Sequence, residues 1–175
     1  MKYFAYGSNM SLDRIQKRCP SAVKIGVASI SKYKFACHKA SADISSKADA
    51  VWTGSSSDKI YGVVYEISGK DDIAYLDVCE GVPIHYKRKK CNVVINGNRV
   101  KVWVYLAQPD FVGCELRPLF YYMNHIIVGA EENNLPKEYV DMLKSIKVQP
   151  KRKLVEGKAV KPSLERVKSL QCYWQ

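Results

Sequence analysis

Glu80 is the side chain whose surroundings in the sequence best suit proton transfer. It stands between Cys79 and Gly81, after a stretch that places apolar residues on one helical face. A carboxylate between Cys79 and the nearby Val82 is expected to be partly desolvated, and desolvation raises the pKa of a carboxyl group. A glutamate with a raised pKa can take up and return a proton near neutral pH. We therefore expect Glu80 to be a general acid and base; the alternative is a solvated carboxylate at a helix end.

A second polar group follows directly on the first expected strand. Residues 3–6 read Tyr-Phe-Ala-Tyr, a composition that suits a buried strand. Gly7 permits a turn, Ser8 and Asn9 add short polar groups, and a helix is expected from Leu12. Such a strand–turn–helix connection leaves several backbone N–H groups unpaired and pointing the same way, which suits an anion or an oxyanion. The alternative is an ordinary turn after a terminal strand.

Together the two stretches resemble the γ-glutamylcyclotransferase family. Residues 3–10, Tyr-Phe-Ala-Tyr-Gly-Ser-Asn-Met, are similar to the family's N-terminal signature, a Tyr-Gly-Ser-Asn loop at the end of the first strand. Residues 76–82, Leu-Asp-Val-Cys-Glu-Gly-Val, followed by Tyr86, are similar to the segment that carries the family's catalytic glutamate. Two motifs in the right order are more specific than either alone, and the resemblance extends from Lys2 to about Ile146.

The resemblance implies an enzyme that releases 5-oxoproline from a γ-glutamyl compound. The α-amine of the substrate would attack its own γ-carbonyl, with Glu80 as the general acid and base and with no metal or organic cofactor. Backbone N–H groups of the N-terminal loop would stabilise the oxyanion or hold the α-carboxylate. The substrate-binding residues implied in this loop are Tyr6, Gly7, Ser8, Asn9 and Met10. The leaving group, whether an amino acid, an amine or the remainder of glutathione, stays open.

A third segment adds a secondary site residue. Tyr122 lies ahead of residues 128–136, Val-Gly-Ala-Glu-Glu-Asn-Asn-Leu-Pro, which resemble the family's segment after its third site element. The resemblance implies that the Tyr122 hydroxyl helps to hold the substrate; the alternative is a core aromatic on an apolar helix face. For Tyr86 we expect a wall or packing role in the pocket, not proton transfer.

Hydrophobic periodicity predicts the elements that must position these residues. Besides the first strand, the expected strands are 23–30, 33–38, 48–53, 60–67, 86–95 and 99–107. One helix is expected to begin at residue 12. Three others are expected to cover 69–79, 118–132 and 136–146. Residues 40–47 are expected to form a loop, and Arg14, Lys17 and Arg18 to face water. The pattern predicts an α+β domain; the resemblance implies a small mixed β-barrel of about six strands with flanking α-helices.

Length and composition predict one folded domain. The chain has 175 residues, of which 47% are hydrophobic and 26% charged. We expect a domain over residues 1–148 and a basic C-terminal extension over 149–175. No apolar run is long enough to span a membrane, and the first residues lack a signal-peptide pattern. The expectation is therefore a cytoplasmic protein without a membrane partner; its oligomeric state is left open.

Other site chemistries lack their signatures. The six cysteines are scattered singly, with no Cys-x-x-Cys pair, and the three histidines lack metal-ligand spacing. We therefore expect no metal site. Ser8 is not surrounded by a Gly-x-Ser-x-Gly elbow, which argues against a serine hydrolase.

Two alternatives to a cyclotransferase remain. The net charge of +11 raises nucleic-acid binding, but the positive charge is spread along the chain, densest at residues 87–90 and 151–153, and no nucleic-acid-binding module is evident. Nucleic acid is therefore only a weak alternative partner. The runner-up is a non-catalytic binding module of the same fold that recognises a small acidic metabolite or a partner. A Glu80 that points into solvent, or a filled pocket, would favour that reading.

Overall fold

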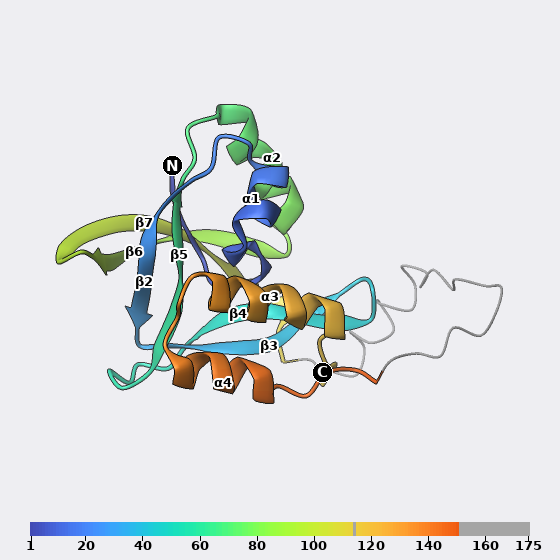
Figure 1. Cartoon of the computed structure of the whole chain (residues 1–175). Coiled ribbons are helices and arrows are strands. Elements are labelled where there is room, and N and C mark those ends of the chain that lie inside the picture. Colours follow the sequence, from blue (N-terminus) through green and yellow to red (C-terminus); the bar gives the residue numbers. More distant parts are fainter. Residues whose placement is uncertain (114, 151–175) are drawn as a thin grey trace.

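A computed structural model describes residues 1–113 and 115–150 (Figure 1). In this part of the chain the strands are β1 (Lys2–Ala5), β2 (Val23–Ser31), β3 (Tyr33–Ser41), β4 (Ser45–Trp52), β5 (Lys59–Glu66), β6 (Tyr86–Ile95) and β7 (Asn98–Ala107). The helices are α1 (Leu12–Arg18), α2 (Lys70–Glu80), α3 (Phe120–Glu132) and α4 (Lys137–Ser145), with short 3-10 turns η1 (Ser8–Met10) and η2 (Pro109–Phe111). The expected α+β class is confirmed.

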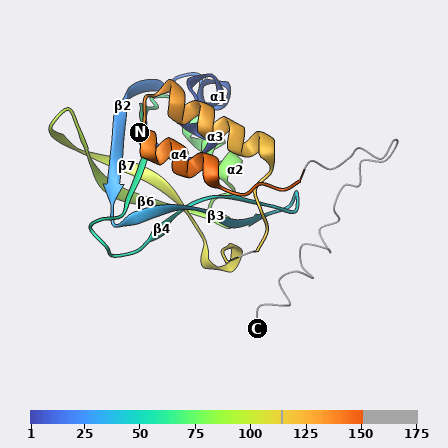
Figure 2. The same ribbon diagram turned by 60° about the horizontal axis from the view of Figure 1, so that its bottom comes forward.

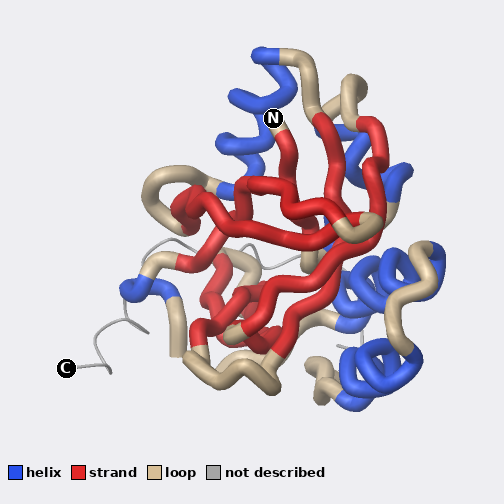
Figure 3. Tube along the Cα trace, turned by 90° about the vertical axis from the view of Figure 1, so that its left-hand side faces the viewer, coloured by secondary structure: helices blue, strands red, loops and turns tan. Residues whose placement is uncertain are grey.

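The main sheet has five strands in the order β2-β5-β1-β7-β6. Its central strand, β1, runs antiparallel to β5 and parallel to β7. The sheet curls so far that its two edge strands approach each other: a Cβ atom built on Gly26 of β2 would lie 3.0 Å from Ile95 of β6. Figure 3 views these curled strands from the side. The result is a half-barrel, and the first strand of the chain lies in its middle.

A second sheet consists of the β3–β4 hairpin, which two side chains attach to the main sheet. Asp49 of β4 accepts a 2.9 Å hydrogen bond from the Ala107 backbone N–H, which lies at the end of β7. The Tyr86 hydroxyl of β6 donates to the Ala48 carbonyl at 2.7 Å. These two bonds fix β4 over the ends of β6 and β7, and so bring Ala48 to the site described below.

The expected loop over residues 40–47 is wrong. Strand β3 continues to Ser41, which pairs with Ser45 at the start of β4, so only residues 42–44 connect the two strands. The small polar residues here read as a loop because surface turns have this composition. In the structure Ser45 is fully buried and its hydroxyl donates to Asp43 at 2.6 Å, so part of this polar hairpin packs into the protein with an internal hydrogen bond.

The helices form two pairs. Figures 1 and 2 show α3 and α4 side by side, and Figure 1 shows α1 next to α2 above them. Helix α3 also contacts the loop after β1, where the Asn133 side-chain amide donates to the Met10 carbonyl at 3.0 Å. None of the described helices combines the length and the apolar composition needed to cross a lipid bilayer.

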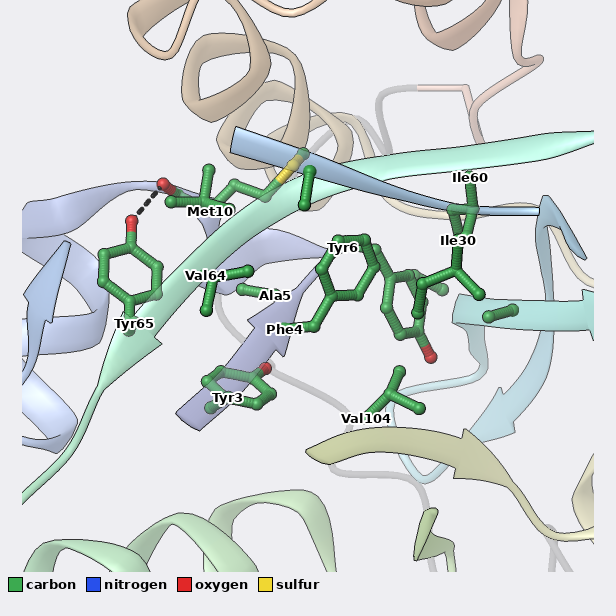
Figure 4. Packing of buried hydrophobic residues seen from close by; sticks show 14 of the residues in the cluster. Tyr3, Phe4, Ala5, Tyr6, Met10, Ile30, Ile60, Val64, Tyr65 and Val104 are labelled. Atoms are coloured by element: carbon green, nitrogen blue, oxygen red, sulfur yellow. Dashed lines mark hydrogen bonds between the residues drawn. The ribbon is translucent and has the colours of Figure 1, made fainter. Parts of the chain in front are cut away.

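The core lies between the curled sheet and the helices, and Figure 4 shows part of it. Phe4 of β1 and Val63 and Val64 of β5 are fully buried. Burial of each such side chain contributes about 1.5–3 kcal/mol to folding. The hydroxyl of the core residue Tyr65 donates to the Met10 carbonyl at 2.6 Å (Figure 4). This hydrogen bond attaches the loop after β1 directly to the core.

The C-terminal end of the described chain is attached to the domain. The Gln149 backbone N–H donates to the Pro118 carbonyl at 2.9 Å, and its side-chain amide donates to the Ile44 carbonyl at 2.7 Å. Gln149, the first residue of the expected basic extension, is therefore held by the domain. Residues 151–175 of that expected extension lie outside the described residues.

Candidate active site

A small polar pocket, partly open to solvent, lies where β1 ends. Segments that are far apart in the sequence contribute to it: β1 and its loop, β4, the end of α2, β6, β7 and α3. The lining residues are Tyr3, Tyr6, Gly7, Ser8, Asn9, Ala48, Glu80, Tyr86, Tyr105 and Tyr122. All the site residues expected from the sequence are thus brought together, with the exception of Met10.

Met10 anchors the loop and does not line the pocket. Its side chain is fully buried, and its backbone N–H donates to the Gly7 carbonyl at 3.0 Å. Its carbonyl accepts hydrogen bonds from Tyr65 and Asn133. Both backbone groups of Met10 are therefore occupied within the protein, and the N–H group that we expected to contact the substrate is already bonded.

The amides of Gly7, Ser8 and Asn9 are available. They precede the first hydrogen bond of the η1 turn, the one from Met10 to Gly7, and among the described residues none of the three N–H groups donates a hydrogen bond. The first amides of a helical turn have no partner within the turn. All three residues line the pocket, so their N–H groups can bind an oxyanion or a carboxylate there.

Glu80 also lines this pocket, within hydrogen-bond distance of the loop residue Asn9. It is the last residue of α2, which ends because Gly81 takes the left-handed conformation, with φ of 69°. The side chain is only 18% exposed, and its Oε1 accepts hydrogen bonds from Asn9 at 3.0 Å and Arg18 at 3.4 Å. Burial raises the pKa of Glu80, while the Arg18 charge and the Asn9 hydrogen bond partly oppose that rise. Glu80 is therefore not a solvated helix-end residue.

The expectation that Arg14 and Arg18 face water is wrong. Both side chains are half-buried, and Arg18 reaches across to Asn9 and Glu80. Lys17 is exposed as expected and pairs with Asp13 at 2.7 Å. The sequence shows the helix and its charges, but helical spacing alone does not reveal that α2 lies beside α1. The Arg18–Glu80 contact is therefore a feature that the sequence analysis missed.

Tyr122 and Tyr86 hold the same peptide segment of β4. The Ala48 backbone N–H donates to the Tyr122 hydroxyl oxygen at 3.0 Å, which leaves the hydroxyl hydrogen of Tyr122 available on the pocket side. The Tyr86 hydroxyl donates to the Ala48 carbonyl, so its hydrogen is used. Burial raises the pKa of both hydroxyl groups, which keeps them neutral. Tyr86 thus forms a wall of the pocket, whereas Tyr122 can still donate a hydrogen bond.

Two further tyrosines complete the wall, and the sequence analysis did not single them out. The Tyr3 hydroxyl accepts a 3.1 Å hydrogen bond from Asn9, and the Tyr105 hydroxyl donates to Asp77 at 2.7 Å. Alternation along β1 and β7 identifies the faces that carry them. It does not indicate that these faces meet at one pocket, because that depends on the parallel pairing of β1 with β7.

Within residues 1–113 and 115–150 there is no group of three or more His, Cys, Asp or Glu side chains that could hold a metal ion. The chemistry available to the pocket from these residues is that of one carboxylate, three backbone amides and several neutral tyrosines. The fold and the pocket thus define an α+β half-barrel protein with a small polar ligand site at the end of its central strand.

Known proteins share this fold and much of the sequence. The family model described as "Gamma-glutamyl cyclotransferase, AIG2-like" matches residues 3–122. The mouse protein named gamma-glutamylcyclotransferase is 33% identical over 158 residues, covering 82% of this chain and 77% of the mouse protein. The human protein of the same name is 32% identical over 158 residues, with the same coverage of both chains. A solved structure titled "Gamma-glutamyl cyclotransferase" has a TM-score of 0.76 at 28% identity, covering 99% of this chain and 98% of the other.

The chain belongs to the γ-glutamyl cyclotransferase, AIG2-like family. The resemblance identified from residues 3–10 and 76–82 is confirmed.

Proposed function

We propose that this protein is a cyclotransferase that releases 5-oxoproline from a small γ-glutamyl compound, with Glu80 as the general acid and base. The relatives named gamma-glutamylcyclotransferase support the reaction class. The observation that carries the role of Glu80 is its position: a carboxylate of raised pKa lines the same pocket as three unpaired backbone amides. A mere binding site for an acidic metabolite has no use for such a carboxylate.

The reaction needs one proton carrier. The α-amine of the substrate is an ammonium ion at neutral pH and cannot attack until it loses a proton, which Glu80 accepts. The amine nitrogen then forms a bond to the γ-carbonyl carbon and closes a five-membered ring. Glu80 gives this proton to the departing nitrogen as the bond between that nitrogen and the carbonyl carbon breaks. It then takes the second proton from the ring nitrogen, which becomes an amide N–H, and the released amine carries that proton away as its ammonium ion. The raised pKa suits both steps, since a base that ionises nearer to neutral pH is also a usable acid.

The loop amides supply the electrostatic part of catalysis. Attack converts the γ-carbonyl oxygen into an oxyanion, and the N–H groups of Gly7, Ser8 and Asn9 can donate hydrogen bonds to it or to the α-carboxylate. These donors need not reorganise during the reaction, because Tyr65 and Asn133 already fix the loop through the Met10 carbonyl. Folding the substrate into a ring-closing shape within a small pocket supplies the entropic part.

Tyr122 serves in substrate binding. Its hydroxyl oxygen is occupied by the Ala48 N–H, so the hydroxyl acts as a donor toward the pocket. A neutral donor at this position suits a carbonyl or carboxylate oxygen of the substrate. Because burial raises the pKa of Tyr122, it remains a donor across the working pH range of an enzyme.

The test is release of 5-oxoproline, measured by mass spectrometry. The panel holds γ-glutamyl-alanine, γ-glutamyl-ε-lysine and glutathione, each with the wild type, Glu80→Gln and the exposed control Glu138→Gln. We expect turnover of at least one compound by the wild type and by Glu138→Gln, and a loss of about 10²–10⁴-fold in Glu80→Gln. The compound that is turned over identifies the leaving group.

Binding data separate the runner-up function from this one. Calorimetric titration with the same compounds and with 5-oxoproline measures affinity without turnover. Binding without 5-oxoproline release, at equal affinity in the wild type and Glu80→Gln, would favour a non-catalytic binding module.

A further inference from the structure

Two side chains from different segments, Asn9 and Arg18, contact the same carboxylate oxygen of Glu80. Asn9 Nδ2 donates to Glu80 Oε1 at 3.0 Å, and Arg18 Nη1 lies 3.4 Å from the same oxygen. Arg18 Nη1 also donates to Asn9 Oδ1 at 3.0 Å. The three groups therefore form a closed triangle at the edge of the pocket.

The chemistry of the partners fixes the orientation of the Asn9 amide. A guanidinium group can only donate hydrogen bonds and a carboxylate only accepts them, so Asn9 Oδ1 must face Arg18 and Nδ2 must face Glu80. The second hydrogen of Nδ2 is used by the Tyr3 hydroxyl at 3.1 Å. Both side-chain N–H donors of Asn9 are thus used within the protein, and its backbone N–H is the donor that remains for a ligand.

The two carboxylate oxygens of Glu80 differ in their hydrogen bonds. Both hydrogen bonds end on Oε1, and in the described part of the chain Oε2 accepts none. We propose that Arg18, acting through Asn9 and Glu80, is a positioning residue that holds Oε1 in place and leaves Oε2 as the atom that exchanges protons with the substrate. This inference rests on the proposed function of Glu80.

The charged groups around Glu80 also support the positioning role of Arg18. Three cations face Glu80 from the elements packed against it: Arg14 and Arg18 on α1 and Lys39 on β3, and Arg18 opposes the effect of burial most strongly. The neighbouring pocket tyrosines stay neutral because burial raises their pKa values, and the buried Cys19 thiol has a pKa of about 11. Of the three cations, Arg18 is the one with a hydrogen bond to Glu80 among the described residues.

The test compares four proteins: wild type, Arg18→Gln, Arg18→Lys and the exposed control Lys17→Gln from the same helix. The first readout is the pH titration of the Glu80 carboxyl group, which is monitored by ¹³C NMR of glutamate-labelled protein without substrate. The Glu80 signal is assigned by its absence in Glu80→Gln. The second readout is kcat and KM for γ-glutamyl-alanine between pH 5.5 and 9. The NMR titration does not depend on turnover. If the protein is not a cyclotransferase, only the kinetic readout fails. If Arg18 does not position Glu80, the NMR titration of Arg18→Gln matches that of Lys17→Gln.

We expect Arg18→Gln to raise the pKa of Glu80 and to move the acid limb of kcat/KM to higher pH. Its kcat should fall about tenfold at pH 6, with less loss at pH 8.5, because a charge-assisted hydrogen bond to the carboxylate is gone. Arg18→Lys keeps the charge but replaces the planar guanidinium group with a compact ammonium group on a flexible stem, which holds the carboxylate less rigidly. Its acid limb should stay near that of the wild type while the plateau of kcat falls and KM changes little.

Two outcomes would overturn the proposal. One is a Glu80 titration in Arg18→Gln that matches Lys17→Gln. The other is a loss of activity in both Arg18 variants that appears in KM alone. Thermal unfolding of each variant is recorded alongside; if Arg18→Gln does not fold, Arg18→Lys still decides between positioning and charge.

Discussion

Asn9 donates its side-chain amide to Glu80 at 3.0 Å, although 71 positions separate the two residues in the sequence. Asn9 belongs to the loop that follows the first strand, and Glu80 ends a helix. This hydrogen bond joins the two motifs that identify the family, and it places the carboxylate beside the loop that carries the amides. The geometry yields testable consequences for stability as well as for activity.

Glu80→Gln should stabilise the protein at neutral pH while it lowers turnover about 10²–10⁴-fold. Burial raises the pKa of Glu80 above its ordinary 4.5, so the folded protein favours the neutral carboxyl group. Relative to a neutral side chain, the native state loses stability as pH rises through the raised pKa, and none is lost below pH 4.5. We expect the melting temperature of Glu80→Gln to exceed that of the wild type at pH 8 and to converge with it at pH 4. A constant difference across this range, or the same trend in the exposed control Glu138→Gln, would contradict the argument.

Tyr122→Phe should impair both binding and folding. The Ala48 N–H loses its acceptor, which costs about 1–3 kcal/mol of the free energy of unfolding, and the pocket loses a donor. We expect a rise in KM and a drop in kcat/KM of about tenfold. Tyr121→Phe is the matched control, because Tyr121 is 59% exposed on the same helix and does not line the pocket. Denaturant unfolding and steady-state kinetics measure the two effects, and equal behaviour of the two variants would count against a site role for Tyr122.

Gly129→Ala should disturb the loop from behind. A Cβ atom at Gly129 of α3 would lie 2.8 Å from the Ser11 backbone nitrogen and 2.9 Å from the Met10 Cβ, so the helix and the loop must separate. Overpacking of this kind costs about 1–3 kcal/mol. Because the loop carries the pocket amides, we expect kcat/KM to fall even at temperatures where the variant is fully folded. Asn124→Ala on the exposed face of α3 serves as the control, and full activity of folded Gly129→Ala would disprove the coupling.

Alkaline pH should unfold the protein together with ionisation of its pocket tyrosines. Burial raises the pKa values of Tyr3, Tyr6, Tyr86, Tyr105 and Tyr122 above the ordinary 10.0. Stability is therefore intact below pH 10 and falls as pH rises above it, since only the unfolded chain releases these protons readily. Tyrosinate absorbance and circular dichroism should change together in this range. Ionisation of these tyrosines in a protein that retains its native circular dichroism would contradict this prediction.

The sequence predicts the parts of the site that local chemistry marks. Glu80 is identified by its apolar neighbours and the glycine that ends its helix, and the loop is identified by a strand that leads into a glycine turn. The sequence also predicts most of the strands and helices, because each has its own periodicity. Arg18 and Tyr105 escape this reasoning, since their roles depend on which helix or strand lies next to their own. The expected loop over residues 40–47 is wrong because a partly buried polar hairpin has the composition of a surface loop.

The position of β1 has a consequence for how the protein is made. This strand is synthesised before both of its partners, β5 on one side and β7 on the other, and β7 ends only at Ala107. Pairing across such sequence distances forms late, because the intervening chain must close a large loop first. A growing chain that already contains both the loop and Glu80 therefore still lacks a pocket. It acquires one only when β7 is inserted beside β1 and Tyr122 arrives on α3, so a strand that is synthesised before all its partners is among the last segments to become functional.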